Sequence, residues 1–204
     1  LELIHEDISG IKIGLQYITQ RSPEEIRELS KFKKPIFYDG KFFDIKNTLI
    51  GSVKSLEKLN VNYATVHLLN GLNALKAAND AAQKINLNLL GVSVLTSFGN
   101  EDLLKLGFKD KVEEQVTRLI KIALEANLFG VICSPLEIKM VKKIAPNLKC
   151  FTPGIRMGET KDDQKRTMNA NEAIKEGSDC LIIGRPITKG DPKENIKYIL
   201  SSIE

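Results

Sequence analysis

The chain has 204 residues, of which 42% are apolar and 27% charged, with a formal net charge of +4. This composition is typical of a globular domain with one large core, and the positive charge is too small and too scattered for a nucleic-acid-binding protein. No apolar run approaches the roughly 20 residues that span a membrane, and no basic segment followed by an apolar one marks a leader. We therefore predict one domain, residues 1–204, that binds neither nucleic acid nor membrane.

The three cysteines, Cys133, Cys150 and Cys180, are an odd number and lie far apart inside apolar runs. This pattern is typical of buried, reduced thiols in a cytoplasmic protein.

Apolar runs alternate along the chain with stretches of helical periodicity. Residues 1–7 have the pattern of a helix already under way, so we expect residues to be missing upstream. Ser22-Pro23-Glu24-Glu25 has the residues of a helix start, with a capping serine, a proline at the first helical position and a glutamate at the third. The predicted strands are residues 11–15, 35–38, 63–67, 87–95, 129–133, 148–152 and 179–184. The predicted helices are residues 23–32, 47–59, 72–84, 111–126, 135–144, 169–176 and 191–202.

Strict alternation of strands and helices predicts a parallel sheet, and the near-continuous apolar strands predict helices on its faces. Seven such units, with an eighth lost from the start, predict an α/β fold of the (β/α)8 barrel type. Its first strand is missing from the chain as given. A doubly wound open sheet is the alternative, although no GxGxxG follows the first strand as a dinucleotide-binding fold would require.

Charged residues crowd the end of the strand that begins at residue 35. Asp39 and Lys41 are two apart and so share one side of that strand, whereas Asp44 needs the following turn to join them. Lys12 lies in the strand before. In parallel α/β folds the carboxyl ends of strands bind ligands, so these residues are candidates for a site. A solvated salt bridge in a loop is the other interpretation, and these residues alone do not choose between the two.

Other polar residues also follow predicted strands. Arg156 and Arg185 end consecutive strands, one after Pro-Gly and the other after Gly184, which favours a phosphate site. The polar stretch of residues 157–166 has the length of a lid or binding loop. The remaining strand-end candidates are His67, Thr96 and Ser134.

The histidines give a weak signal. His67 follows a strand, where a histidine more often makes structural hydrogen bonds than acid–base contacts. With only His5 and His67 in the chain, and no cysteine cluster, we expect no metal site.

Taken together, these residues resemble the orotidine 5′-phosphate decarboxylase family over essentially the whole chain. The family motif Asp-x-Lys-x-x-Asp-Ile-x-x-Thr is matched by Asp39, Lys41, Asp44, Ile45 and Thr48. Further matches are Lys12-Ile13-Gly14, Leu95-Thr96-Ser97, Pro153-Gly154-Ile155-Arg156, Asp163-Gln164 and Gly184-Arg185-Pro186-Ile187-Thr188. Two departures are the absent first strand, which in the family usually carries an aspartate, and Phe43-Asp44-Ile45-Lys46 in place of His-Asp-Ile-Pro.

The resemblance implies a carbon–carbon lyase of de novo pyrimidine biosynthesis that converts orotidine 5′-phosphate to uridine 5′-phosphate and CO2 without cofactor or metal. Lys41 would protonate C6 of the pyrimidine, and Asp39 would lie beside the departing carboxylate. Asp44 and Lys12 would orient Lys41 and bind ribose hydroxyls. In the family the residue matching Asp44 enters the neighbouring subunit's site, which implies a homodimer with shared active sites.

The resemblance also assigns substrate contacts. Thr96 and Pro153 would lie near the pyrimidine, while Gln164, Gly184 and Arg185 would hold the phosphate as the lid closes. Thr48 and Arg156 complete the predicted substrate-binding set. A metal-dependent barrel like 3-keto-hexulose-phosphate synthase, or a nucleotide-phosphate-binding barrel without turnover, are the alternatives.

Overall fold

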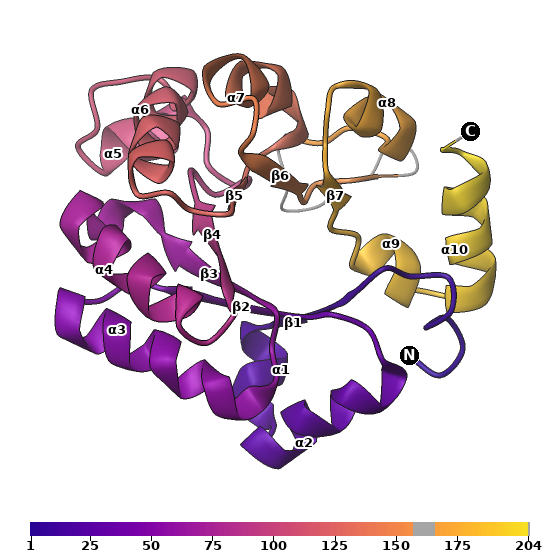
Figure 1. Ribbon diagram of the computed structural model, residues 1–204. Coiled ribbons are helices and arrows are strands. Elements are labelled where there is room, and N and C mark those ends of the chain that lie inside the picture. Colours follow the sequence, from indigo (N-terminus) through magenta and orange to yellow (C-terminus); the bar gives the residue numbers. More distant parts are fainter. Residues whose placement is uncertain (157–165, 204) are drawn as a thin grey trace. The chain divides into compact units, whose positions relative to one another are not determined.

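The computed structural model describes residues 1–156 and 166–203, and Figure 1 shows the order of its helices and strands. The chain forms two compact units, and each is described by itself. The first contains Leu1–Val92 and Ile122–Gly130, and the second contains Ser93–Lys121 and Val131–Glu204.

The strands of the first unit are parallel neighbours in chain order. Residue pairs such as Ile11↔Ile36 and Tyr63↔Asn88 set their register. The elements of this unit are β1 (Ile11–Gly14), α1 (Leu15–Gln20), α2 (Pro23–Glu28), η1 (Leu29–Phe32), β2 (Ile36–Phe42), α3 (Lys46–Ser55), η2 (Leu56–Leu59), β3 (Tyr63–His67), η3 (Leu68–Asn70), α4 (Leu72–Gln83) and β4 (Asn88–Val92).

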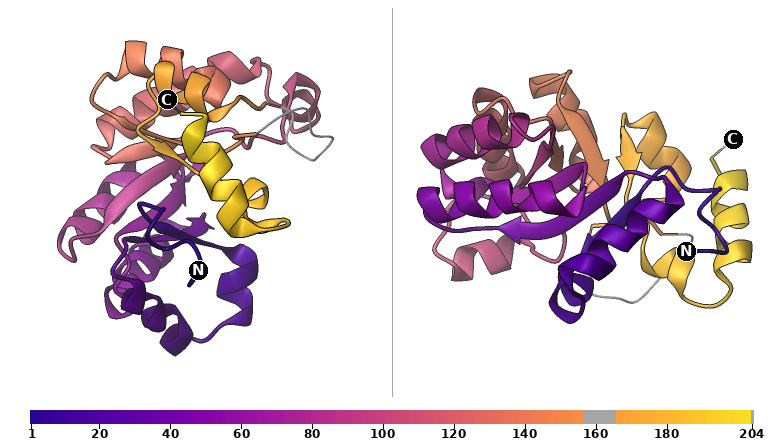
Figure 2. Two further views of the ribbon diagram at one scale, coloured as in Figure 1. Left: turned by 90° about the vertical axis from the view of Figure 1, so that its right-hand side faces the viewer. Right: turned by 60° about the horizontal axis from the view of Figure 1, so that its bottom comes forward.

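Helices α3 and α4 lie side by side, as the right-hand view of Figure 2 shows. Each turns one apolar stripe inward: Leu49 and Val53 of α3 are fully buried, and so are Leu75 and Ala78 of α4. The spacings of four and three residues place each pair on one helix face, which explains why these segments fold as packed helices. The buried Asn79 side chain of α4 donates to the carbonyls of Ala126 (3.3 Å) and Asn127 (2.8 Å).

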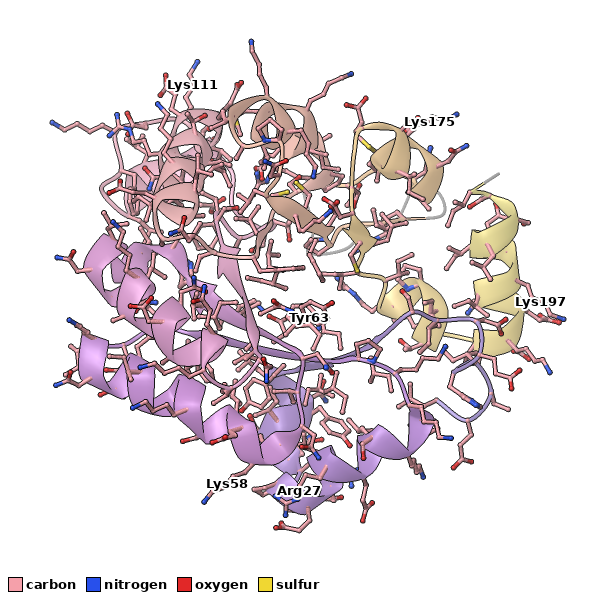
Figure 3. The ribbon with its side chains drawn as sticks, viewed as in Figure 1. Arg27, Lys58, Tyr63, Lys111, Lys175 and Lys197 are labelled. Atoms are coloured by element: carbon pink, nitrogen blue, oxygen red, sulfur yellow. The ribbon has the colours of Figure 1, made fainter. Side chains whose placement is uncertain are left out.

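A hydrogen bond also joins α2 to η2 in this unit. The Arg27 guanidinium on α2 donates to the Lys58 carbonyl in η2 at 3.3 Å, and Figure 3 shows the two labelled side chains in the same region.

The second unit continues the alternation of strands and helices. Strand β6 pairs in parallel with β7 through Phe151↔Cys180 and Thr152↔Leu181, and the Cys133 amide donates to the Phe151 carbonyl at 3.3 Å. The remaining elements are α5 (Asn100–Lys105), α6 (Val112–Glu125), β5 (Gly130–Ile132), η4 (Pro135–Glu137), α7 (Ile138–Ile144), β6 (Lys149–Thr152), α8 (Ala170–Lys175), β7 (Cys180–Leu181), α9 (Arg185–Thr188) and α10 (Pro192–Ser201).

The amino ends of β6 and β7 are joined by ion pairs. Asp179 accepts from Lys142 Nζ at 2.5 Å and from Lys149 Nζ at 2.9 Å, and its carboxylate also accepts the Cys150 amide at 2.8 Å. Burial raises the pKa of Asp179, but the hydrogen bonds from Lys142, the Cys150 amide and Lys149, with the charge of Lys142, outweigh it, so the pKa falls below its usual value. In barrel enzymes this end of the strands stabilises the fold.

Four features differ from the sequence predictions. Residues 1–7 form turns rather than the end of a helix, with Leu1 O accepting from the amides of Ile4 and His5. The second strand runs to Phe42, and the last strand is only two residues long. Short helices α1, α5 and α9 were not predicted.

Within the described residues, no helix is both long enough and apolar enough to cross a membrane.

Candidate active site

Three predicted site residues meet at the carboxyl ends of β1 and β2. Asp39 Oδ1 lies 2.8 Å from Lys41 Nζ, and Asp39 Oδ2 lies 3.3 Å from Lys12 Nζ. We call Lys12, Asp39 and Lys41 the charged cluster. The side chain of Asp39 is 13% exposed and those of the two lysines about one third, so one carboxylate is nearly enclosed by two ammonium groups.

The backbone of Lys41 is unusual for a strand. Its φ is +49°, and the pairing of β2 with β3 shifts register between Tyr38 and Phe42. Left-handed backbone costs most residues about 1–2 kcal/mol, so the surroundings must hold it. The Lys41 amide donates to Thr65 Oγ1 on β3 at 2.8 Å, which satisfies a group that the shifted register leaves without its strand partner.

The electrostatics of the cluster keep Asp39 ionised. Burial raises the pKa of Asp39, but the charges of Lys41 and Lys12 and hydrogen bonds from Lys41 and Thr65 outweigh it, so its pKa falls below the usual value. A fixed carboxylate that orients an ammonium group suits proton delivery to a carbanion.

Two glycines make room for this arrangement. A Cβ at Gly14 would lie 3.3 Å from Lys12 Nζ, and one at Gly40 would lie 2.7 Å from a ring carbon of Tyr38. The glycine of the Lys-x-Gly sequence therefore leaves space for the lysine head group.

Asp44 stands apart from the charged cluster. Asp44 is exposed. Its Oδ1 accepts the Ile45 amide at 2.7 Å, and its own amide donates to Asn70 Oδ1 at 3.0 Å. Asn70 also donates to the carbonyls of Phe42 (2.9 Å) and His67 (2.7 Å). This asparagine therefore fixes the turn that carries Asp44, while the carboxylate faces solvent.

His67 makes structural contacts. Its Nδ1 accepts the Leu69 amide at 3.3 Å, and its ring lies 5.5 Å from that of Phe43. Burial, with the charge of Lys41, lowers the pKa of His67. Thr48, also predicted as a substrate contact, lies exposed in the first turn of α3.

The other predicted substrate contacts belong to the second unit. Thr96 lies in the turn after Val94, and Pro153 follows β6. Arg156 is buried and its amide donates to the Met168 carbonyl at 3.0 Å. Gly184 caps α9, where Arg185 is the exposed first residue. Gln164 and the lid, apart from Arg166, lie outside the described residues.

A pocket of about 430 Å³ lies within the second unit. Arg156, Asn169 and Glu172 line it together with Lys175 and Tyr198. Figure 3 shows Lys175 on α8 and Lys197 on α10, the helix that also carries Tyr198.

A family profile described as "Orotidine 5'-phosphate decarboxylase / HUMPS family" matches residues 1–199. The chain belongs to this family. Its sequence is 40% identical over 202 residues to the orotidine 5'-phosphate decarboxylase of Wolbachia pipientis from Culex pipiens, covering 98% of this chain and 89% of that protein. It is 37% identical to the enzyme of Lawsonia intracellularis, covering 98% and 90% of the two chains.

Solved structures agree with this assignment. The crystal structure of orotidine 5'-phosphate decarboxylase from Lactobacillus acidophilus matches with a TM-score of 0.81 at 32% identity, covering 95% of this chain and 86% of that one. An uncharacterized conserved protein from Geobacillus kaustophilus, 23% identical, shares the fold with a TM-score of 0.80 over 96% and 88% of the two chains. The predicted (β/α)8 barrel class is thereby confirmed.

Three residues of the sequence motifs that resemble this family, Lys12, Asp39 and Lys41, form the charged cluster in the structure. Two further residues support them and were not predicted: Thr65, which bonds the charged cluster, and Asn70, which holds the Asp44 turn. Thr65 lies two positions before His67 and so shares its side of β3. The alternation of side chains along a strand could therefore have indicated Thr65 from the sequence.

Ser134, a predicted strand-end candidate, has a structural role instead. It caps η4 in a reciprocal arrangement with the buried Glu137, whose carboxylate accepts the Ser134 amide at 2.9 Å and forms an ion pair with Arg166. Arg166 also donates to the carbonyls of Val94 (3.1 Å) and Leu95 (2.9 Å). These bonds hold the backbone directly before Thr96 in place.

Among the residues that the structure describes, no three His, Cys, Asp or Glu side chains are grouped as metal ligands would be.

Proposed function

We propose that this chain is an orotidine 5′-phosphate decarboxylase that forms uridine 5′-phosphate and CO2. The observation that carries the proposal is the charged cluster, in which Asp39 holds the ammonium group of Lys41 at 2.8 Å. Curated relatives at 40%, 38% and 37% identity over nearly the whole chain carry that enzyme's name.

In the proposed reaction the bond between C6 and the carboxylate carbon breaks, and its electron pair stays on C6. Lys41 stabilises this developing negative charge and then donates a proton to C6, which completes uridine 5′-phosphate. A preorganised donor aimed at developing charge is worth about 3–4 kcal/mol. Asp39 lies beside the departing carboxylate and fixes Lys41, and Lys12 holds the other oxygen of Asp39 and binds ribose hydroxyls.

The phosphate of the substrate is proposed to contact Gln164, Gly184 and Arg185. Two features support this: α9 begins directly after Gly184, and a Cβ built on that glycine would meet no atom within 4 Å. Backbone amides at such a position can donate to an anion at close range, and the guanidinium supplies paired donors. Thr48, Thr96, Pro153 and Arg156 are the remaining proposed substrate contacts, and residues 157–166 the proposed lid.

The family description also names HUMPS, so membership alone leaves a second activity open. The metal-dependent 3-keto-hexulose-phosphate synthase-like alternative predicts loss of activity with EDTA. The binding-only alternative predicts affinity for uridine 5′-phosphate without turnover.

An absorbance assay on orotidine 5′-phosphate tests the proposal, with and without EDTA, alongside calorimetry with uridine 5′-phosphate. We expect turnover that EDTA does not change. Lys41→Ala is expected to abolish turnover while nucleotide affinity stays within about tenfold, because the lysine acts on the transition state. Binding without turnover by the parent protein would contradict the proposed function.

We further propose a homodimer whose active sites are shared. Asp44 does not contact the charged cluster among the described residues, and it is flanked by exposed apolar side chains, Phe43 at 63% and Ile45 at 74% exposure. Leu15 and Leu69 in the same unit are also exposed, at 54% and 42%. Apolar side chains around a solvent-facing carboxylate suit an interface that carries Asp44 to the partner's cluster.

Mixing two inactive variants, Lys41→Ala and Asp44→Ala, tests this. In a hybrid dimer one site regains both an intact Lys41 and an intact Asp44, so activity should reappear on mixing. If mass measurements confirm exchange of chains and activity stays absent, Asp44 acts within its own chain.

We also propose that residues 1–204 work as a single barrel domain in the cytoplasm. The family match runs through both units, and Cys133, Cys150 and Cys180 are all free thiols, as expected in a reducing compartment.

A further inference from the structure

Thr65 closes a ring of hydrogen bonds around the charged cluster. Its Oγ1 accepts the Lys41 amide at 2.8 Å and donates to Asp39 Oδ1 at 3.0 Å, and the same carboxylate oxygen accepts Lys41 Nζ at 2.8 Å. One hydroxyl therefore contacts both the backbone of the proposed proton donor and the group that orients its side chain.

The direction of each bond follows from the donors available. The Lys41 amide can only donate, so the hydroxyl must accept there, and its single proton is left for the carboxylate. A carboxylate that accepts from both Thr65 and Lys41 is held in its ionised form. Thr65 is completely buried on β3, so water does not replace either bond.

Packing holds the hydroxyl in place. Thr65 is flanked in β3 by Ala64 and Val66, which are also completely buried, and its backbone pairs with Leu90 of β4. A branched side chain in a paired strand has few rotamers, so the hydroxyl has a defined direction. The left-handed backbone at Lys41 is thereby braced by a central strand rather than by a loop.

We infer that Thr65 is a positioning residue for decarboxylation: its hydroxyl sets the backbone of Lys41 and the ionised carboxylate of Asp39 together. The inference rests on the proposed function. Thr65 does not need to touch the substrate for this role, because it acts through its two partners.

Three substitutions separate the hydroxyl from the packing. Thr65→Val keeps the volume and branching but removes the hydroxyl, Thr65→Ala removes both, and Thr65→Ser keeps the hydroxyl. Thr117→Val is the matched control, because Thr117 lies on α6 in the other unit and its Oγ1 donates to Met140 Sδ on α7 at 3.0 Å, away from the charged cluster.

We expect Thr65→Val and Thr65→Ala to lower kcat about 10- to 100-fold, as loss of a hydrogen bond to a charged group does. The affinity for uridine 5′-phosphate should stay within about threefold, and Thr65→Ser should recover most of kcat. Thr117→Val should leave kcat unchanged. Unchanged kcat in Thr65→Val, or an equal loss in Thr65→Ser, would overturn the inference.

Carbon-13 NMR titration of Asp39 gives a reading that needs no activity. The pKa of Asp39 should rise in Thr65→Val relative to the parent and return in Thr65→Ser, and an unchanged pKa in Thr65→Val would refute the inference. Inactivity of the parent on orotidine 5′-phosphate would instead refute the proposed function. If neither hydroxyl-free variant folds, amide exchange in the parent decides, because an unprotected Lys41 amide contradicts a bond to Thr65.

Discussion

Replacing Lys41 by glycine should give a more stable protein than replacing it by alanine. Both variants lose the ammonium group and its ion pair with Asp39, so they differ only in how they tolerate the backbone. Of the described non-glycine residues with positive φ, Lys41 alone lies in a strand; the others, Lys33, Asn60, Asn86 and Asn127, lie in turns or at helix ends.

The size of the difference follows from two opposing terms. A left-handed conformation costs an L-residue about 1–2 kcal/mol, a cost that glycine avoids. Glycine loses about 0.5–1 kcal/mol more conformational entropy on folding. The net advantage of glycine is therefore about 1 kcal/mol, or about 2–4 °C in Tm for a chain of this size.

Urea unfolding of the two variants measures this difference, and the same pair of substitutions at Lys121 provides the control. Lys121 is exposed within α6, where glycine should be the less stable choice by about 1 kcal/mol. The sign of the difference should thus reverse between the two positions. If Lys41→Ala is at least as stable as Lys41→Gly, Lys41 does not adopt the left-handed backbone in solution.

Three further changes test other parts of the structure. Because the pKa of Asp39 is lowered on folding, its stabilising contribution is present above its unfolded pKa of about 3.9 and is lost as pH falls through the folded value. The difference in unfolding free energy between the parent and Asp39→Asn should therefore shrink as pH falls below about 4, and a constant difference would contradict the lowered pKa. Arg185→Ala should weaken turnover of orotidine 5′-phosphate more than that of orotidine, and equal losses on both would remove its phosphate role. Glu137→Gln should destabilise the fold by about 3 kcal/mol, because it leaves the mostly buried Arg166 guanidinium without its counter-charge. Glu176→Gln, which breaks the more exposed pair with Lys139, should cost under about 1 kcal/mol. Equal urea midpoints for the two variants would exclude a stabilising buried pair.

Much of the fold was predictable because its signals are local. The predicted strand of residues 63–67 coincides with β3, and the Ser22 capping arrangement appears as predicted at α2. The family resemblance likewise rests on short motifs that can be recognised in the sequence without knowledge of the structure. Residues 1–7 were mispredicted because so short a segment does not form a stable helix from its own hydrogen bonds, whatever its apolar spacing.

The parts that could not be predicted depend on contacts between distant residues. The end of β2 was missed because Asp39, Gly40 and Lys41 have no strand pattern, and their pairing depends on Thr65, which lies 24 residues beyond Lys41. The two-residue spacing of Asp39 and Lys41 correctly predicted that they share one side of the strand, but nothing in the local sequence indicates a left-handed backbone at Lys41. The Asn70 contact to the Asp44 turn is of the same kind, since an asparagine after a strand predicts only a turn.

The charged cluster also carries an imbalance of charge. Two ammonium groups face one carboxylate, which leaves one unit of positive charge, while the exposed Asp44 carries one unit of the opposite sign. In the proposed dimer each chain would neutralise the other's excess, so association should depend on ionic strength. Since the screening length falls from about 10 Å at 0.1 M salt to about 3 Å at 1 M, concentrated salt should loosen the dimer and reduce activity together.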